Sequence, residues 1–144
     1  HSILFSVAYL SLERDFNNYY FIIRGEIYYT NLDLVTGSEQ CGYRPVVVLQ
    51  NNVGNFYSPT TIVAAITSRL KTNMPTHVHI ENKCLSCNSV ILLEHIRTVD
   101  KSRLEEYQGK LTQEEISELD KALAISLDLR IREDKKNGQD KSSK

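Results

Sequence analysis

The sequence has no run of apolar residues long enough to cross a membrane, for which about 18 in succession are needed. It also lacks the pattern of an export signal, because its apolar start (residues 1–12) has no cationic segment and no small-residue cleavage site. Cysteines are few, and their odd number (Cys41, Cys84 and Cys87) does not suggest a disulfide framework. We therefore expect a protein of the reducing cytoplasm that does not span a membrane.

There is no excess of positive charge either. The chain has 17 Lys and Arg against 18 Asp and Glu, a formal net charge of −1, which excludes a protein coated in basic surface, such as a histone. The charges are nevertheless segregated. Residues 24–99 carry six positive and five negative groups, whereas residues 100–129 carry four and eight. An anionic ligand is expected to avoid residues 100–129 and to bind the middle of the chain.

What the sequence does contain is a series of short strands. Its 144 residues, 41% of them hydrophobic, suffice for one domain around one core. Runs rich in β-branched, aromatic and aliphatic residues predict strands over 25–32, 44–50, 60–68, 77–80 and 89–94. Polar loops rich in glycine and asparagine separate the first of these, including residues 33–43 and 51–59. Five or six short strands spaced in this way predict a small antiparallel β-barrel.

The pattern becomes helical after residue 100. Residues 100–107 are expected to form one or two short helical turns. Thr112 followed by Glu115 is a capping-box signature. Apolar residues then recur at three and four, which predicts an amphipathic helix over 113–129 that buries Ile116, Leu119, Leu123 and Leu127. The residues after Arg130 have no apolar anchors and are predicted to be disordered.

The densest group of chemically useful side chains is the stretch 37–45, GSEQCGYRP. It places a hydroxyl, a carboxylate, an amide and a guanidinium just before a buried strand. Arg44 leaves the junction of loop and strand, a rigid base from which it can bind an anion. The alternative is a surface arginine that pairs with Glu39.

Several short motifs, in this order, resemble the MazF/PemK toxin family. They are residues 24–28 (RGEIY), 37–40 (GSEQ) with Arg44-Pro45, Gln50-Asn51, 65–67 (AIT), 75–77 (PTH) and 94–98 (EHIRT). The resemblance covers about residues 24–129. It divides the chain into an N-terminal extension (1–23), a toxin-like domain (24–129) and a polar tail (130–144).

The resemblance implies an SH3-like, PemK-type β-barrel with a C-terminal helix that forms a homodimer. It implies a sequence-specific endoribonuclease that cleaves single-stranded mRNA without a metal or other cofactor, with Arg44 and Thr67 as the catalytic residues. The implied partner is a cognate antitoxin whose disordered acidic segment occupies the RNA groove. The residues expected to bind RNA are Arg24, Ser38, Glu39, Gln40, Ser68 and His95.

These residue types suit metal-free RNA cleavage. The neighbouring 2′-hydroxyl is then the nucleophile, and the products end in a 2′,3′-cyclic phosphate and a 5′-hydroxyl. Negative charge grows on the phosphoryl oxygens, where Arg44 can hold it with two N–H donors and Thr67 can add a hydroxyl hydrogen bond. Neither residue readily accepts a proton. The general base therefore stays unassigned.

His95 follows Glu94, at a position where the family usually has glutamine. Three interpretations stay open: a histidine at the barrel rim with a backbone partner, a residue that reads a base edge, and a general acid or base. The substitution bears on the target sequence more than on the activity.

The residue types of His77, His79, Cys84 and Cys87 would suit zinc. His77, however, belongs to the family's PTH motif, so no metal ligand is assigned, and a redox CxxC or an unpaired loop remain as alternatives. Arg97 is expected to pair with Glu94 or Asp100.

Tyr28 and Tyr29 point to opposite faces of their strand. One of them is expected in the core, which leaves the other as a candidate to stack on a base.

Two rival functions fit the same fold. One is a toxin that poisons DNA gyrase by contact, but such relatives use a tryptophan-bearing C-terminal end, and this chain has no tryptophan. The other is an inactive, nucleic-acid-binding homologue, against which the presence of both Arg44 and Thr67 argues.

Overall fold

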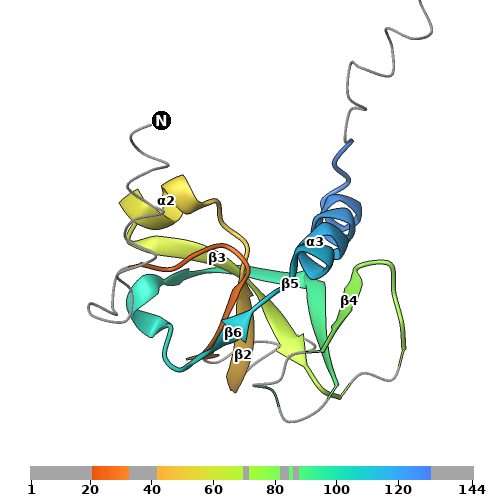
Figure 1. The fold of residues 1–144 in the computed structure, drawn as a ribbon, viewed down its shortest axis with the longest axis horizontal. Coiled ribbons are helices and arrows are strands. Elements are labelled where there is room, and N and C mark those ends of the chain that lie inside the picture. The colour runs from red at the N-terminus through yellow and green to blue at the C-terminus, as the bar shows by residue number, and fades with distance from the viewer. Residues whose placement is uncertain (1–20, 33–41, 70–71, 82–84, 86–87, 131–144) are drawn as a thin grey trace, which may run out of the picture.

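The chain folds into one strongly curled sheet with a helix at its C-terminal end (Figure 1). The computed structural model describes residues 21–32, 42–69, 72–81, 85 and 88–130. The elements in chain order are β1 (Glu26–Asn31), β2 (Tyr43–Val48), α2 (Asn52–Tyr57), β3 (Thr60–Thr67), β4 (His77–Ile80), β5 (Ser89–Asp100), the 3₁₀ turn η1 (Lys101–Arg103), β6 (Tyr107–Lys110) and α3 (Gln113–Ser126).

The six strands form a single antiparallel sheet in the order β4-β5-β3-β2-β1-β6. The sheet curls into a half-barrel, which confirms the predicted mainly-β barrel class with its C-terminal helix. The long strand β5 pairs with both β3 and β4, and its register against β3 shifts between Ala64 and Ala65. Such a bulge increases the local twist and bend, which helps one sheet to enclose a core.

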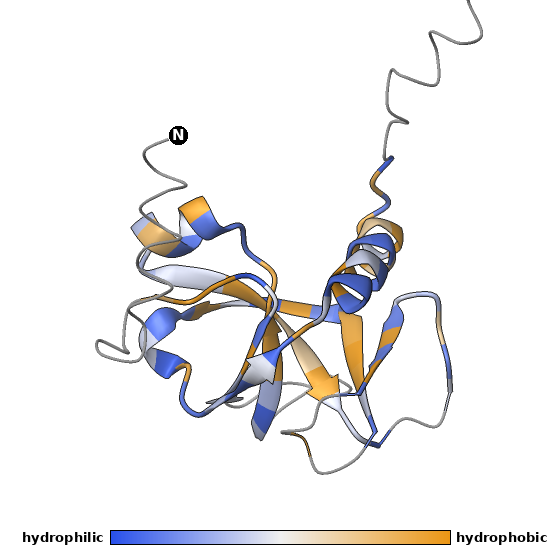
Figure 2. Cartoon of the chain, viewed as in Figure 1, coloured by the Kyte–Doolittle hydropathy of each residue, from blue (hydrophilic) through white to orange (hydrophobic). Residues whose placement is uncertain are grey.

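Residues from the middle of the sheet make the main core. Ile27, Val47, Ile66, Ile91 and Leu93 are buried in one apolar cluster. Figure 2 shows the apolar residues concentrated on these central strands, while α3 carries many hydrophilic residues. Alternate residues of a strand face opposite sides, so one face of each strand feeds this core. Tyr28 is also buried, as expected for one of the two adjacent tyrosines, and belongs to a smaller cluster.

Helix α3 closes the core through one apolar stripe. Leu119 is fully buried, and Ile116 and Leu123 pack against the main cluster. The predicted capping box is present: the Glu115 N–H donates to Thr112 Oγ1, and the Thr112 N–H donates to the Glu115 carboxylate. The prediction that Leu127 is buried was wrong. The helix ends at Ser126, and the Leu127 side chain is 53% exposed.

A short helix replaces one predicted loop. Residues 52–57 form α2, which Asn51 caps by accepting a hydrogen bond from the Gly54 N–H at 2.8 Å. The buried ammonium of Lys101 donates to the carbonyl of Asn55 at 2.7 Å and so ties α2 to the end of β5. Desolvation lowers the pKa of Lys101 although neighbouring Asp100 opposes the shift.

The segment after β5 also differs from the expectation. Only residues 101–103 form a helical turn, and residues 107–110 form the edge strand β6 beside β1. Strand β5 itself extends to Asp100, well beyond the predicted end at residue 94. Within the described part of the chain, no helix is both long and apolar enough to cross a membrane.

Candidate functional site

Two strand ends that meet at one edge of the sheet form the candidate site. Strand β2 begins at Tyr43, and β3 ends at Thr67. The two strands are antiparallel, with Val46 opposite Ala65. Two residues further toward these ends, the same register places Arg44 opposite Thr67. Pairing of the sheet therefore brings together two residues that the sequence analysis assigned to catalysis.

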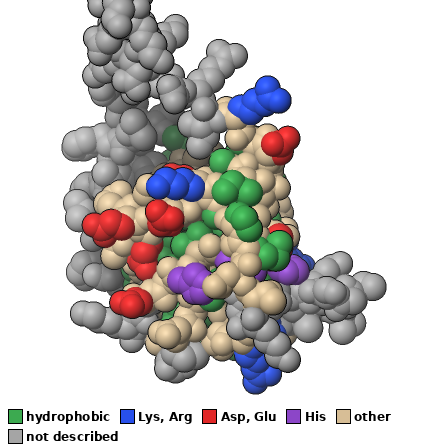
Figure 3. Space-filling view, turned by 90° about the vertical axis from the view of Figure 1, so that its right-hand side faces the viewer, with side chains coloured by type: hydrophobic (Ala, Val, Ile, Leu, Met, Phe, Trp, Pro, Cys, Tyr) green, Lys and Arg blue, Asp and Glu red, His purple; other side chains and the backbone are tan. Residues whose placement is uncertain are grey.

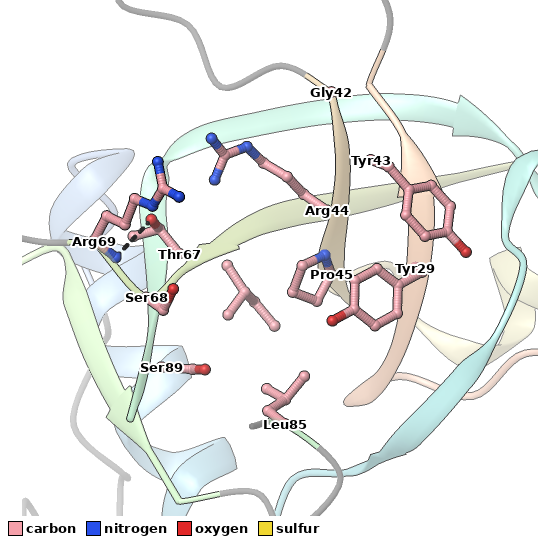
Figure 4. A pocket seen from close by; sticks show the side chains of 11 residues that line it. Tyr29, Gly42, Tyr43, Arg44, Pro45, Thr67, Ser68, Arg69, Leu85 and Ser89 are labelled. Atoms are coloured by element: carbon pink, nitrogen blue, oxygen red, sulfur yellow. Dashed lines mark hydrogen bonds between the residues drawn. The ribbon is translucent and has the colours of Figure 1, made fainter. Parts of the chain in front are cut away.

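A cavity of about 410 Å³ opens beside these strand ends. Figure 4 shows Arg44, Thr67 and Arg69 on one side of it and Tyr29 and Tyr43 on the other. The full lining consists of Tyr29, Gly42, Tyr43, Arg44, Pro45, Ile66, Thr67, Ser68, Arg69, Leu85 and Ser89. Ser68, predicted to bind RNA, is thus part of the same cavity. The cavity has a cationic end and an aromatic end.

At the cationic end, the Thr67 hydroxyl is held by the backbone that follows it. The N–H of Arg69 donates to Thr67 Oγ1 at 3.2 Å. Because a hydroxyl has one proton and two lone pairs, this bond occupies an acceptor position and leaves the proton for another partner. Thr67 is buried, Arg44 is half-buried and Arg69 is exposed. The arrangement combines two cations with an oriented hydroxyl, which suits an anion such as a phosphate.

The aromatic end is a pair of stacked rings. The centroids of Tyr29 and Tyr43 lie 5.1 Å apart with the ring planes 15° from parallel. Tyr43 is 51% exposed, so the stack presents a ring face at the cavity. Desolvation raises the pKa of the Tyr43 phenol, and the charges of Glu106 and Glu105 add to this shift, with Tyr29 contributing further. Carboxylates therefore lie near this end of the cavity, which makes it unfavourable for a phosphate.

A second cavity is electrostatically unsuited to an anion. It measures about 480 Å³, lies between β4 and α3, and has Glu81, Glu114 and Glu115 in its lining. Figure 3 looks onto this side of the molecule and shows several carboxylates gathered there. The structure thus agrees with the charge pattern of the sequence, in which residues 100–129 are acidic. An anionic ligand is directed to the Arg44 cavity instead.

Not all predicted RNA-binding residues come to this cavity. Arg24 precedes β1 and therefore lies at the end of the β1–β2 pair that is far from Arg44. Its Nε donates to the Leu49 carbonyl at 2.7 Å and its Nη2 to Asp120 at 2.8 Å. These two bonds link α3 to the end of the sheet, and the role of Arg24 in RNA binding stays a prediction. The predictions for Ser38, Glu39 and Gln40 concern residues outside those that the structure describes.

His95 also lies outside the cavity lining. Val90 is the β5 residue opposite Thr67, and beyond the register shift Ile96, the neighbour of His95, is opposite Ala64, which precedes Thr67 by three residues. His95 is therefore not the strand neighbour of Thr67, and its three interpretations stay open. The described lining contains no histidine, aspartate or glutamate.

The structure gives His77 a structural environment. Its Nδ1 accepts a hydrogen bond from the Met74 N–H at 3.1 Å, and its Nε2 lies 2.7 Å from Glu94 Oε2. Both ring nitrogens are thus engaged, which leaves none for a metal. His79 bonds Asn73 at 3.0 Å, while Cys84 and Cys87 fall outside the described residues. Within the described ranges no three His, Cys, Asp or Glu side chains are grouped to hold a metal ion.

Within the described part of the chain, Arg97 forms no ion pair with Glu94 or Asp100, its expected partners. Its Nη1 donates to the carbonyl of Leu32 at 2.6 Å, which joins β5 to the end of β1.

The sequence analysis did not identify Arg69 and Tyr43 as cavity residues. The available signal was adjacency, since Tyr43 immediately precedes Arg44 and Arg69 comes two residues after Thr67.

Comparison with known proteins places this geometry in a family. Residues 23–127 match the model of the PemK-like, MazF-like toxins of type II toxin–antitoxin systems. The fold is similar to that of MazF from Deinococcus radiodurans, with a TM-score of 0.65 and 27% identity over 74% of this chain and 96% of that one.

Two complexes are also similar. A MazE–MazF crystal structure from Deinococcus radiodurans matches with a TM-score of 0.61 and 26% identity over 76% of this chain and 97% of that one. An endoribonuclease in complex with its cognate antitoxin, from a mycobacterial species, matches in fold with a TM-score of 0.66 and 24% identity over 77% and 99%. The chain belongs to the PemK-like, MazF-like toxin family of type II toxin–antitoxin systems.

Proposed function

We propose that this protein is a metal-independent endoribonuclease that cleaves single-stranded mRNA at a short sequence and acts in the cytoplasm as the toxin of its pair. One observation carries the proposal: Arg44 and Thr67 line one cavity, with the Thr67 hydroxyl oriented by a backbone N–H. Family membership supports the same activity.

The proposed reaction is an internal displacement at phosphorus. The 2′-oxygen of the ribose forms a bond to the adjacent phosphorus, and the bond from phosphorus to the 5′-oxygen breaks. The products are a 2′,3′-cyclic phosphate and a 5′-hydroxyl. The 2′-hydroxyl proton is released to a base, and the leaving 5′-oxygen takes up a proton. No metal or other cofactor enters these steps.

Arg44 and Thr67 act on the charge that develops in this reaction. The Arg44 guanidinium donates to the phosphoryl oxygens as their negative charge grows, and the Thr67 hydroxyl donates to the same group. Donors fixed before the reaction need no reorganisation, and loss of one such donor typically slows catalysis by roughly 10²–10³-fold. Because the described lining has no histidine, aspartate or glutamate, positioning and charge stabilisation account for its part in catalysis.

The same cavity suits an acidic protein inhibitor. The proposed antitoxin carries a disordered acidic segment that occupies the RNA groove. Carboxylates compete with phosphates for a guanidinium because both accept two parallel N–H bonds. The complexes of two similar toxins with their antitoxins support a protein partner of this kind.

We further propose that the toxin is a homodimer. Three large apolar side chains at the C-terminal end of α3 and just beyond it, Ile125, Leu127 and Leu129, are each more than half exposed. Such a group on the surface is typical of a region that a partner covers. A Leu127→Glu variant is expected to shift the mass found by sedimentation from dimer toward monomer. An unchanged dimer would place the interface elsewhere, and a monomeric wild type would exclude the homodimer.

The activity is tested by incubating the purified protein with a long RNA in EDTA. Arg44→Ala and Thr67→Ala are compared with Arg130→Ala, which removes an exposed arginine after α3. We expect discrete fragments with cyclic phosphate ends from the wild type and from Arg130→Ala, and a rate lower by roughly 10²-fold or more for the other two.

Each alternative outcome has a distinct meaning. Intact RNA after removal of any co-purified antitoxin would exclude the nuclease. Binding of RNA without cleavage would indicate the inactive homologue. Loss of cleavage in EDTA, restored by added metal, would show that the reaction depends on a metal ion.

A further inference from the structure

The guanidinium of Arg69 is a cation at the cavity that the reaction described above does not use. Arg69 is exposed and lines the cavity beside Thr67 (Figure 4). In the described ranges, no carboxylate forms an ion pair with it. Several other cations are bonded within the described residues: Arg24 to Asp120, Arg97 to the Leu32 carbonyl, Lys101 to the Asn55 carbonyl and Lys121 to Glu118.

The backbone of Arg69 is anchored beside Thr67. The Arg69 N–H donates to Thr67 Oγ1 at 3.2 Å, so a hydrogen bond from its backbone holds the residue beside the catalytic threonine. In Figure 4 the side chains of Arg44 and Arg69 lie on the same side of the cavity, away from the stacked rings of Tyr29 and Tyr43. The two arginines differ in environment, because Arg44 is half-buried and Arg69 is exposed.

This difference assigns different tasks to the two arginines. A half-buried guanidinium faces less competition from water and suits the charge that develops at the reacting phosphate. An exposed guanidinium acts through counterion release, which favours binding of any phosphate but contributes little to one transition state. An RNA strand carries one phosphate per nucleotide, so a second phosphate lies next to the one that reacts.

We propose that Arg69 forms a second phosphate subsite, which binds the RNA phosphate adjacent to the one held by Arg44 and Thr67. The proposal rests on the proposed function for the identity of the polymer. It predicts that Arg69 contributes to binding, regardless of base sequence, and contributes little to the chemical step.

The binding test uses a ligand that cannot be cut. A single-stranded RNA of mixed sequence with 2′-O-methyl riboses lacks the attacking hydroxyl and carries a fluorophore for anisotropy. Affinity is measured over a series of salt concentrations for wild type, Arg69→Ala, Arg69→Lys and Arg130→Ala. The last variant is the matched control, since it removes the same charge from an exposed position outside the cavity lining.

The expected result is a change in salt dependence. Loss of one phosphate contact should reduce the slope of log affinity against log salt by about 0.7 for a single strand, which is about fivefold in affinity over one decade of salt. Arg69→Lys should keep this slope, and Arg130→Ala should match the wild type. A slope for Arg69→Ala equal to that of Arg130→Ala would overturn the proposal.

A kinetic test separates binding from an indirect effect on Thr67. With cleavable RNA, Arg69→Ala should raise KM about fivefold, in line with the salt slope, and leave kcat within about threefold, whereas Arg44→Ala should lower kcat. A fall in kcat for Arg69→Ala with KM unchanged would overturn the subsite and indicate a role in positioning Thr67. The backbone N–H that bonds Thr67 is present in every variant.

The outcomes also distinguish this proposal from the proposed function. If the wild type fails to cut RNA but Arg69→Ala still weakens binding with the smaller slope, the nuclease is excluded and the subsite stands. If the wild type cuts RNA and Arg69→Ala behaves as Arg130→Ala does, the subsite is excluded and the nuclease stands. A wild type that binds no single-stranded RNA excludes both.

Discussion

His77 on β4 and Glu94 on β5 are joined by a hydrogen bond of 2.7 Å between the imidazole Nε2 and the carboxylate Oε2, with the His77 side chain only 2% exposed. Because Nδ1 accepts from the Met74 N–H, the proton of a neutral imidazole is on Nε2, which donates to Glu94. The Thr76 hydroxyl donates to the other carboxylate oxygen at 3.2 Å. Glu94 thus fastens the segment before β4 to the sheet.

This relationship predicts a pH dependence of stability. Partial burial tends to raise the pKa of Glu94, but hydrogen bonds from His77, the backbone and Thr76, with the charge of His77, together lower it below 4.5. A carboxylate with a lowered folded-state pKa stabilises the fold above its unfolded pKa, and this contribution is lost as the pH falls through the folded value. The free energy of unfolding of the wild type should therefore decrease below about pH 4.5.

Glu94→Gln should remove that part of the pH dependence. We expect it to lower the free energy of unfolding by about 1–2 kcal/mol at neutral pH, since a charge-assisted hydrogen bond is replaced by a neutral one. Urea unfolding followed by circular dichroism, at neutral pH and at several acidic values, measures both effects. Glu118→Gln is the control because Glu118 is exposed and only 3.4 Å from Lys121 on the same helix. Equal pH profiles for wild type and Glu94→Gln would contradict the prediction.

Thr67 should be sensitive to loss of its hydroxyl and insensitive to loss of its methyl group. Thr67→Val keeps the shape but removes the donor to phosphate, so single-turnover cleavage should slow by roughly 10²-fold or more. Thr67→Ser keeps the hydroxyl and the acceptor for the Arg69 N–H, and its rate should stay within about tenfold of the wild type, since the donor that carries the effect remains. Thr98→Val, at an exposed position of β5, is the control. A Thr67→Val enzyme as active as Thr67→Ser would remove the hydroxyl from the mechanism.

The stacked pair of Tyr29 and Tyr43 should bind a nucleobase. Stacking of one base on an aromatic ring is worth about 1–3 kcal/mol, so Tyr43→Ala should weaken binding of single-stranded RNA by roughly 5- to 150-fold. Tyr43→Phe retains the ring face and should bind as the wild type does. Tyr57→Ala is the matched control, since Tyr57 is 63% exposed and outside the cavity lining. Equal losses for Tyr43→Ala and Tyr43→Phe would show that the hydroxyl matters instead of the ring.

His95 should affect which sequence is cut more than how fast. It is absent from the described lining of the Arg44 cavity, so His95→Gln should shift the cleavage motif mapped from fragment ends while the pH profile of the rate stays the same. A base-reading side chain that changes its donors and acceptors changes the base edge it prefers. An inflection near neutral pH that disappears in His95→Gln would instead make the histidine an acid or base of the reaction.

The sequence predicted the strands of the central sheet well because their hydrophobic periodicity is strong. Strand β4 has its predicted bounds, and the capping box of Thr112 marks the start of α3. The prediction from sequence failed where the same residues are common in more than one kind of structure or where the pattern is weak. Residues 52–57 look like a loop because asparagine and glycine are frequent in turns, yet here Asn51 is a helix cap. The edge strand β6 has only four residues and no buried apolar side chain, so its pairing with β1 is not visible in the pattern.

The residues of the candidate site could likewise be predicted from the sequence only in part. Arg44 and Thr67 could be named from motifs, but their proximity depends on the register of β2 and β3. Arg24 was grouped with them from sequence alone. In an antiparallel pair the start of β2 lies beside the end of β1, so a residue that precedes β1 must lie at the far end from Arg44. Knowledge of the strand pairing, and not of the residue types, separates these two arginines.

Gly25 should not tolerate a side chain. Its φ is +90°, where residues with a Cβ are strained, and an added Cβ would lie 2.7 Å from Cδ1 of Ile116 on α3. Gly25→Ala should therefore lower the free energy of unfolding by about 2–3 kcal/mol, roughly 1–2 from the backbone and about 1 from the displaced isoleucine. Urea unfolding measures the change.

Two further variants separate these causes. Gly42 has φ of +81°, and none of the described residues has an atom within 4 Å of an added Cβ, so Gly42→Ala should show the backbone cost alone, about 1–2 kcal/mol. Ile116→Val removes the Cδ1 that the new methyl group would meet. In the Ile116→Val background, the cost of Gly25→Ala should fall to that of Gly42→Ala, because only the backbone strain remains. If the cost of Gly25→Ala is the same in both backgrounds, the contact between this turn and α3 is not what requires glycine there.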